Sequence, residues 1–260
     1  MTQYPVQFVG AGPGDPELIT VKGKHALETA DLVVYAGSLV PDAVLTWAGK
    51  DARLENSAEM DLEAIVDIMA QAHFNGGQVV RLHSGDPSLY GAIAEQLRIL
   101  EQKGVPCRII PGVTAAFAAA AALKVEYTLP EVSQSLILTR MQGRTPVPEK
   151  ENLASLAAHQ TSMAVYLSAG LADKLQDVLA ANYGPDAPVA VVCRASHKDE
   201  KVLWTTAADL EETMKAAQIS RQALVIAGPA LEAQKTRDFS ASRLYDKTFT
   251  HGYRKGHGSK

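Results

Sequence analysis

Short apolar runs alternate with stretches of helical hydrophobic spacing along the first half of the chain. In residues 62–74, for example, Leu62, Ile65, Val66 and Met69 fall on one face of a helix. Four apolar runs predict strands, at Val6–Gly10, Asp31–Ala36, Gln78–Leu82 and Arg108–Ile110. Helices are predicted at Thr20–Ala30, Leu62–Phe74, Ala92–Leu100 and Val113–Leu123. This alternation predicts a mostly parallel sheet with helices on both faces.

The second half has a different order of elements. Five runs predict strands, at Ser135–Thr139, Met163–Leu167, Val189–Val192, Lys201–Trp204 and Ala223–Ala227. Helical stretches separate some of them, at Glu151–Ala158, Asp173–Ala181 and Ala207–Ala217. Only a short polar loop, RASHKDE, lies between the third and fourth of these strands. A loop this short joins antiparallel strands, so we expect a mixed sheet here.

Together these patterns predict an α/β protein made of two α/β domains. We place the N-terminal domain at residues 1–126 and the C-terminal domain at residues 135–235. Residues 127–134 are expected to form a linker, and residues 236–260 a polar tail. A chain of 260 residues is long enough for each domain to bury a core of its own.

Composition and charge exclude several classes of protein. The chain is 47% hydrophobic and 21% charged, as in ordinary globular proteins, and its net charge of −4 offers no positive field to nucleic acid or to an anionic membrane. No apolar run reaches the ~18 residues that span a bilayer, and the N-terminus lacks a signal-peptide pattern. The two cysteines, Cys107 and Cys193, lie far apart in apolar runs, which favours reduced thiols and a cytoplasmic location. The seven histidines show no metal-ligand spacing, so no metal is expected.

A glycine-rich loop, Gly10–Pro16, follows the first predicted strand. Glycines allow a sharp turn and a close approach of backbone to ligand. The loop invites comparison with the dinucleotide-binding motif G-x-G-x-x-G, but Asp15 stands where the last glycine belongs. That motif also needs an acidic residue at the end of the second strand, whereas Asp31 begins that strand. A nicotinamide-dependent oxidoreductase is therefore disfavoured, and a purely structural turn remains an alternative.

Two more loops of the same kind follow later strands. Ser84–Gly91 and Pro111–Ala115 each come at the carboxyl end of a predicted strand and lead into a helix. Ligands bind at that edge of open α/β sheets. Three such breaks predict one ligand held mainly by backbone groups. S-adenosylmethionine suits this cradle because it is a zwitterion without phosphates, although the loops alone do not distinguish it from other ligands.

At these motifs the chain resembles the tetrapyrrole methylase family. The matching stretches, in order, are VGAGPGDPELIT (Val9–Thr20), the GDP loop (Gly85–Pro87), PGVTA (Pro111–Ala115), VYLSAG (Val165–Gly170) and ALVIAG (Ala223–Gly228). The resemblance implies a class III methyltransferase-like fold with S-adenosylmethionine held in a cleft between the two domains. It also implies a homodimer and S-adenosyl-L-homocysteine as a product.

The resemblance further implies which residues hold the cofactor. The predicted contacts are Pro13, Ser84, Gly85, Asp86, Leu89, Thr114, Ala115, Leu167, Thr205 and Ala223. The match at Thr205 is the least secure, because WTTA departs from the usual glycine.

Two further stretches resemble the subgroup of this family that methylates precorrin-4 at C11 in cobalamin biosynthesis. They are YAGSLVP (Tyr35–Pro41) and VEYTLPEVSQSLILTR (Val125–Arg140). Family members that methylate uroporphyrinogen carry a sequence similar to YDRLV at the first of these places. Its aspartate is a proposed proton acceptor. Ala36 replaces that aspartate here. The implied substrate is therefore a precorrin, cobalt-free or cobalt-loaded, and no residue is assigned as the catalytic base.

The chemistry of such a substrate suggests candidate contacts. Precorrins carry many carboxylates, which arginine pairs with bidentately. Arg53, Arg81, Arg140 and Arg144 are candidates, and we select Arg140, Tyr127 and Ser38 as substrate-binding residues. Each also has a structural interpretation: Arg140 as a surface arginine, Tyr127 as a linker contact and Ser38 as a helix cap.

Two alternative functions remain open. A methyltransferase of the same fold could act on a macromolecule, either ribosomal RNA or a diphthamide precursor, although the acidic charge counts against RNA. The other alternative belongs to another class of protein, either a non-catalytic tetrapyrrole carrier or the nicotinamide-dependent oxidoreductase described for the first loop.

Overall fold

A computed structural model describes residues 4–37 and 39–257. Its internal contacts divide the chain into two compact units. Unit 1 holds the chain up to Ala118 together with Arg194–Glu200. Unit 2 holds Ala119–Cys193 and everything from Lys201 onward. The short segment Arg194–Glu200 therefore belongs to unit 1, although the strands on either side of it belong to unit 2.

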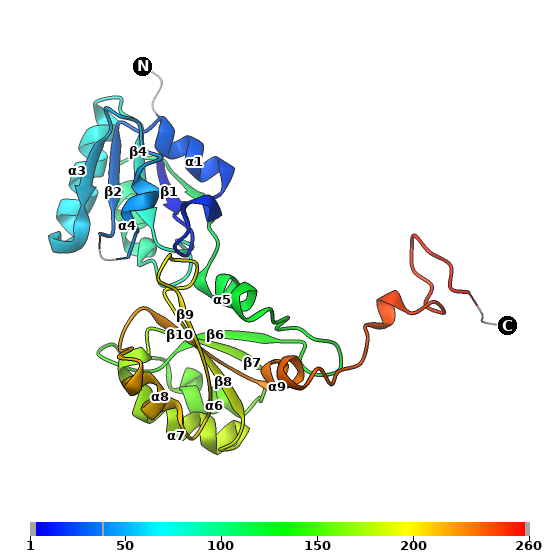
Figure 1. Cartoon of the computed structure of the whole chain (residues 1–260). Helices are drawn as coiled ribbons and strands as arrows, with labels where there is room; N and C mark the ends of the chain where they lie inside the picture. The colour runs from blue at the N-terminus through cyan, green and yellow to red at the C-terminus, as the bar shows by residue number, and fades with distance from the viewer. Residues whose placement is uncertain (1–3, 38, 258–260) are drawn as a thin grey trace. The chain divides into compact units, whose positions relative to one another are not determined.

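Unit 1 is built on a parallel sheet of five strands. They are β1 (Val6–Gly10), β2 (Leu32–Tyr35), β3 (Arg53–Asn56), β4 (Val79–His83) and β5 (Cys107–Ile110), in the order β3-β2-β4-β1-β5. Every neighbouring pair is parallel. Figure 1 shows β1, β2 and β4 with α1 and α3 beside them. The parallel sheet predicted from the sequence is confirmed.

Neighbouring residues of the strands supply the two faces of this sheet, because successive side chains point to opposite sides. Val9 and Val33 pack with Leu27 of α1 (Val21–Glu28) and Val44 of α2 (Asp42–Leu45). On the other face, Phe8 and Val34 pack with α3 (Leu62–Phe74) and α4 (Ile93–Gln102), whose buried side chains include Met69 and Leu100. Short 3-10 turns at Pro16–Leu18 and Ser57–Glu59 complete the unit, and α5 (Ala115–Leu123) begins in it.

The hydrophobic pattern did not reveal β3 or α2. Strand β3 lies at the edge of the sheet, and its residues are exposed or half-buried. Its sequence, RLEN, therefore carries no apolar run for a pattern to detect. Charged residues on an edge strand are typical, since they discourage pairing with another chain.

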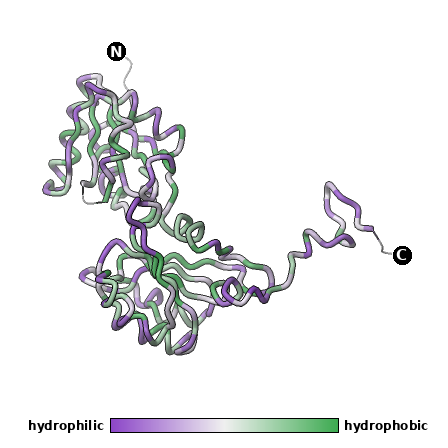
Figure 2. Tube along the Cα trace, in the orientation of Figure 1, coloured by the Kyte–Doolittle hydropathy of each residue, from purple (hydrophilic) through white to green (hydrophobic). Residues whose placement is uncertain are grey.

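Unit 2 is built on a mixed sheet, as predicted. Its strands are β6 (Leu136–Arg140), β7 (Ser162–Tyr166), β8 (Pro188–Cys193), β9 (Lys201–Thr206) and β10 (Ala223–Ala227), in the order β6-β7-β10-β8-β9. Strands β6 and β7 are parallel, and the other neighbouring pairs are antiparallel. In Figure 2 these strands form a hydrophobic centre. The antiparallel pairing of β8 with β9 confirms the interpretation of the short loop between them.

Helices α6 (Leu153–Ala157), α7 (Ala172–Tyr183) and α8 (Leu210–Ala216) cover one face of this sheet. Their buried side chains, among them Leu175, Leu179 and Leu210, pack on Val165, Val191 and Val225 of the strands. Helix α9 (Pro229–Thr236), which packs near β8, was not predicted from the sequence. Single 3-10 turns lie at Glu149–Glu151, Ala169–Leu171 and Arg243–Tyr245.

A buried arginine links several elements of unit 1. The Arg81 guanidinium on β4 donates hydrogen bonds to Gln96 Oε1 at 3.1 Å, to the Val34 carbonyl at 3.3 Å and to Ser57 Oγ at 3.0 Å. Ser57 in turn donates to the Tyr35 carbonyl, and Gln96 to the Ala92 carbonyl. Burial lowers the pKa of Arg81 to about 10. Arg81 is 5% exposed and makes these hydrogen bonds within the fold, so it is not available to a substrate carboxylate.

We predict that Arg81→Ala lowers the free energy of unfolding by about 3 kcal/mol, because it leaves the buried partners of the guanidinium unsatisfied. Urea denaturation followed by circular dichroism measures this change. Arg98→Ala is the matched control, since Arg98 is exposed on the same helix as Gln96. Equal stability of the two variants would contradict the structural role of Arg81.

His83, the last residue of β4, is buried with 5% of its surface exposed. Its ring stacks on Phe8 with centroids 5.9 Å apart, and its Nε2 has no hydrogen-bond partner among the described residues. Burial, followed by the charge of Arg81, lowers the pKa of His83 to about 3. His83 is therefore a neutral core residue.

This lowered pKa predicts a loss of stability in acid. The unfolded chain takes up a proton at His83 near pH 6.5, whereas the folded protein does so only near its folded-state pKa of about 3. Stability therefore falls as the pH drops below 6.5, by roughly 2 kcal/mol from this residue between pH 6.5 and 5. Urea denaturation at both pH values should show this extra loss in the wild type and not in His83→Gln. An identical pH dependence in the two proteins would refute the assignment.

Candidate active site

The order of strands in unit 1 creates a switch point between β1 and β4. The chain leaves β1 toward β2 by way of α1, on one face of the sheet, and leaves β4 toward β5 by way of α4, on the other face. The loops after these adjacent strands therefore diverge at the carboxyl edge. In open α/β sheets, ligands bind in the crevice that such divergence leaves.

The loops after β1 and β4 are joined by backbone hydrogen bonds at this point. Gly85 donates to the Gly12 carbonyl at 2.8 Å, and Gly12 donates back to the Gly85 carbonyl at 3.3 Å. The Ala11 amide donates to the His83 carbonyl at 2.7 Å. Gly12 and Gly85 have φ angles of +79° and +64°, a region that favours glycine. The two predicted loops are thus brought together and held in one conformation.

Three glycine backbones touch beneath these loops. A Cβ atom on Gly112 would lie 2.1 Å from the Gly85 carbonyl oxygen and 2.8 Å from the Gly10 Cα. A Cβ on Gly10 would lie 2.5 Å from the Gly112 Cα. No side chain fits at either position without moving backbone. The third predicted loop therefore packs directly against the other two.

The Asp86 carboxylate fixes the second loop to the third. Its Oδ2 accepts a hydrogen bond from the Gly112 amide at 2.8 Å, and its Oδ1 accepts from the amide of Ser88 at 2.8 Å and from the Ser88 hydroxyl. Burial by itself would raise the pKa of Asp86, but these hydrogen bonds from Ser88 and Gly112 lower it below its usual value. Asp86 is thus an ionised residue that positions backbone.

The two acidic residues that bear on a dinucleotide motif, Asp15 in the first loop and Asp31 at the start of β2, both have structural roles. The Asp15 side chain accepts from the Glu17 amide at 2.9 Å and caps the turn that follows. Asp31 accepts from the Gln78 amide at 2.7 Å at the start of β2. At the other end of β2 stand Tyr35 and then Ala36, so the structure offers no carboxylate from that position to a ribose. The geometry agrees with the sequence argument against a dinucleotide site.

The other predicted cofactor contacts of unit 1 surround this crossing of loops. Pro13 and Thr114 are buried, whereas Ser84, Leu89 and Ala115 are half-buried. Thr114 precedes α5, and its carbonyl accepts from the amides of the first turn. The loops therefore bring the seven predicted contacts of unit 1 to one edge of one sheet.

In unit 2, Leu167 and Ala223 lie at a common sheet edge. Leu167 directly follows β7, and Ala223 begins β10, which runs antiparallel to β7. The Leu167 side chain is 69% exposed, and its φ angle of +54° is costly for a branched residue. Leu167 thus exposes an apolar side chain at this sheet edge.

Arg140 ends β6 at that same edge, in register with Tyr166 of β7. Its guanidinium donates to the carbonyls of Thr145 at 3.2 Å and Pro146 at 2.7 Å, so it shapes the loop that follows β6. A role for Arg140 in binding substrate stays a prediction.

Thr205 and Tyr127 are placed differently. Thr205 pairs with Val189, near the opposite end of the strands from Ala223, and its hydroxyl hydrogen-bonds Thr213 at 2.8 Å. Tyr127 is 6% exposed, and burial together with Tyr166 raises the pKa of its phenol. Its carbonyl accepts from the Ser162 hydroxyl at 2.7 Å. Thr205 does not join Leu167 and Ala223, and the Tyr127 carbonyl supports the fold, while a role for the Tyr127 phenol in binding substrate stays a prediction. The remaining predicted residue, Ser38, lies outside the described residues.

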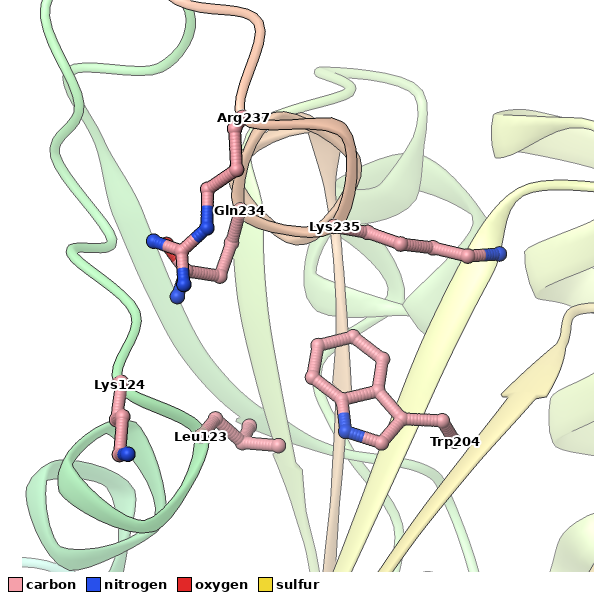
Figure 3. Close-up of a pocket in the computed structure, with 6 residues that line it drawn as sticks. All are labelled: Leu123, Lys124, Trp204, Gln234, Lys235 and Arg237. Carbon is pink, nitrogen blue, oxygen red and sulfur yellow. The ribbon is translucent and has the colours of Figure 1, made fainter.

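Unit 2 contains a hollow of about 350 Å³. Figure 3 shows Trp204 of β9 facing Leu123 and Lys124 at the end of α5, and Gln234, Lys235 and Arg237 on and after α9. Lys124 and Arg237 directly follow the C-termini of these two helices. Cations at that position offset the partial negative charge of the last carbonyls. Their place is explained by the helices, so we assign no ligand to this hollow.

The three loops of unit 1 meet at this edge mainly through contacts between their backbones. Within the described residues no group of three or more His, Cys, Asp or Glu side chains is placed to hold a metal ion. Across the same residues, no helix has the length and apolar character needed to cross a membrane. The geometry suits a ligand held by hydrogen bonds to a rigid backbone.

Comparison with known proteins agrees with this geometry. The sequence profile of the Tetrapyrrole (Corrin/Porphyrin) Methylases matches residues 5–211. The Cobalt-precorrin-4 C(11)-methyltransferase of Methanocaldococcus jannaschii is 51% identical to this chain over 253 residues, which cover 97% of this chain and 96% of that protein.

Solved structures show the same likeness in three dimensions. A cobalt precorrin-4 methyltransferase aligns with a TM-score of 0.85 at 45% identity, over 87% of this chain and 95% of that chain. A uroporphyrin-III C-methyltransferase from Thermus thermophilus, complexed with S-adenyl homocysteine, aligns with a TM-score of 0.74 at 25% identity, over 88% and 94%. The fold class predicted from the sequence is confirmed, and the chain belongs to the tetrapyrrole methylase family.

Proposed function

We propose that this protein transfers the methyl group of S-adenosylmethionine to C11 of precorrin-4, forming precorrin-5 in cobalamin biosynthesis. The likeness to a protein named as a cobalt-precorrin-4 C(11)-methyltransferase, at 51% identity over 97% of this chain, carries the proposal of methyl transfer to C11. The backbone cradle at the switch point of unit 1 supports it independently. S-adenosylmethionine needs hydrogen bonds to its amino-acid and ribose groups. Because it carries no phosphate, its binding site needs no cluster of cationic side chains.

The residues present fit such a donor. Pro13, Ser84, Gly85, Leu89, Thr114 and Ala115 are the proposed contacts in unit 1, and Leu167 and Ala223 are the proposed contacts in unit 2. Asp86 contributes mainly by holding the Gly112 amide in place. The bound sulfonium supplies an already activated methyl group. The chain's own task is to hold donor and acceptor in line, and such alignment accounts for a large share of catalysis in group transfer.

The substrate class rests on the relatives and on one residue at the end of β2. Ala36 occupies the position at which the family's uroporphyrinogen methylases carry an aspartate. It is half-buried and directly follows Tyr35. An alanine cannot accept a proton, which favours a precorrin over uroporphyrinogen. Arg140 is the proposed partner of a substrate carboxylate, with Tyr127 and Ser38 as further proposed contacts. Thr205 is retained only as a weaker proposal for the cofactor.

We infer further that the protein works as a homodimer in the cytoplasm. The family resemblance carries the proposal of a dimer, and Ile109 and Phe117 of unit 1, which are 45% and 55% exposed, are the apolar residues that we propose for its interface. Cys107 is a reduced thiol in the structure, as expected in a reducing compartment.

The first test of this function is binding. Isothermal calorimetry should detect micromolar binding of S-adenosylhomocysteine and no binding of NADH at the same concentration. Transfer of labelled methyl from S-adenosylmethionine to precorrin-4, and separately to cobalt-precorrin-4, then identifies the substrate form. Binding of NADH in place of S-adenosylhomocysteine would support the oxidoreductase alternative, and labelling of ribosomal RNA would support the macromolecular one.

The glycine contact gives a second test. Gly112→Ala should weaken S-adenosylhomocysteine binding at least tenfold, because its Cβ would displace the Gly85 carbonyl. Gly252→Ala is the control, since a Cβ there meets no atom within 4 Å. Calorimetry measures affinity, and circular dichroism checks that both variants are folded. Unchanged affinity in folded Gly112→Ala would place the donor elsewhere.

A further inference from the structure

The polar loop Arg194–Glu200, between β8 and β9, lies against the first glycine loop of unit 1. The Asp15 amide donates a hydrogen bond to Ser196 Oγ at 2.9 Å, across 181 positions of sequence. A Cβ atom on Gly14 would lie 2.2 Å from Cδ2 of the His197 ring, so the ring sits directly on that glycine. Neither contact was anticipated from the sequence.

His197 also bonds the first loop in a defined tautomer. Arg194 Nη2 lies 3.2 Å from His197 Nδ1, and because a guanidinium only donates, Nδ1 accepts. The remaining ring nitrogen of a neutral histidine carries the proton, and the His197 ring hydrogen-bonds the Pro13 carbonyl. Burial and then the charge of Arg194 lower the pKa of His197, which keeps the ring neutral.

The loop is itself held rigid. Arg194 Nε donates to Asp199 Oδ1 at 2.7 Å, and the Ser196 amide donates to Glu200 Oε2 at 2.6 Å. Arg194 and Ser196 adopt φ angles of +52° and +64°, which are unfavourable for residues other than glycine. A strained backbone that its own side chains stabilise is a sign of a preorganised functional element.

We propose that the loop Arg194–Glu200 is a clasp that positions Pro13–Asp15 for the methyl donor, with Ser196 and His197 as positioning residues. This inference rests on the proposed function, because it assumes that the first loop contacts the donor. The clasp contacts Pro13–Asp15 on the side where Gly14, having no side chain, leaves room for the His197 ring. It fixes the Pro13 carbonyl and the Asp15 amide, and so sets the backbone path between them. Neither positioning residue needs to touch the donor.

Calorimetry with S-adenosylhomocysteine tests the clasp. Ser196→Ala and His197→Ala should each raise the Kd about tenfold, because each removes a contact with Pro13–Asp15. Lys198→Ala is the control on the same loop, since Lys198 is exposed. In the absence of ligand, the Asp15 amide should exchange its hydrogen faster in Ser196→Ala than in the wild type.

A double-mutant cycle provides an independent test. Gly14→Ala should raise the Kd at least tenfold in the wild type, because the added methyl group displaces the His197 ring. In a His197→Ala background the space is free, so the same change should raise the Kd less than threefold. Additive effects would overturn the proposal.

The failure of this inference is distinguishable from the failure of the proposed function. A wild type that binds S-adenosylhomocysteine, with Kd values in the Ser196 and His197 variants within twofold of it, overturns the clasp alone. Lower melting temperatures with unchanged Kd values would assign the loop to stability and also overturn it. A wild type that binds no S-adenosylhomocysteine overturns the proposed function, and the clasp with it.

Discussion

The candidate site depends on the contact of three glycine backbones at the carboxyl edge of the unit 1 sheet. Gly10, Gly85 and Gly112 approach one another closely. A Cβ atom added to Gly10 or to Gly112 would lie less than 3 Å from backbone atoms of the neighbouring glycines. This contact allows loops from three strands to share one small region. Paired backbone bonds between Gly12 and Gly85, and the Asp86 bond to Gly112, then leave little freedom for the loops to move. A site made of backbone has no side-chain rotamers to order when a ligand arrives.

Charged residues close to this region serve mainly to hold backbone. Arg81 ties β2, Ser57 and Gln96 together beneath the loops, Asp86 ties two loops at the surface, and Asp15 caps a turn. This use of charge agrees with the chemistry proposed. A sulfonium donor is already activated, so the protein gains more from a fixed geometry than from an additional acid or base.

Much of this arrangement could be predicted because buried elements leave clear patterns in the sequence. The apolar runs of β1, β2 and β4 locate the buried strands, the run of β5 locates an edge strand, and the glycine and proline breaks after β1, β4 and β5 locate the loops. Strand β3 and helix α9 left no such pattern: the strand is an exposed edge, and the helix is short and begins with a proline. Arg81 illustrates the same limit for side chains. The sequence alone does not distinguish an arginine that binds substrate from one that hydrogen-bonds Ser57 and Gln96 inside the fold.

The sequence by itself determined the α/β class, the mixed second sheet, the three loops and the family to which the chain belongs. These depend on local periodicity, on turn chemistry and on motifs that are contiguous in the chain. Only the tertiary structure decided that Gly112 packs on Gly85, that Arg81 is buried, and that Ser196 and His197 meet the loop at Gly14 and Asp15. Contacts between residues 181 positions apart depend on how the chain folds back on itself. No local pattern of hydrophobic and polar positions records that distance.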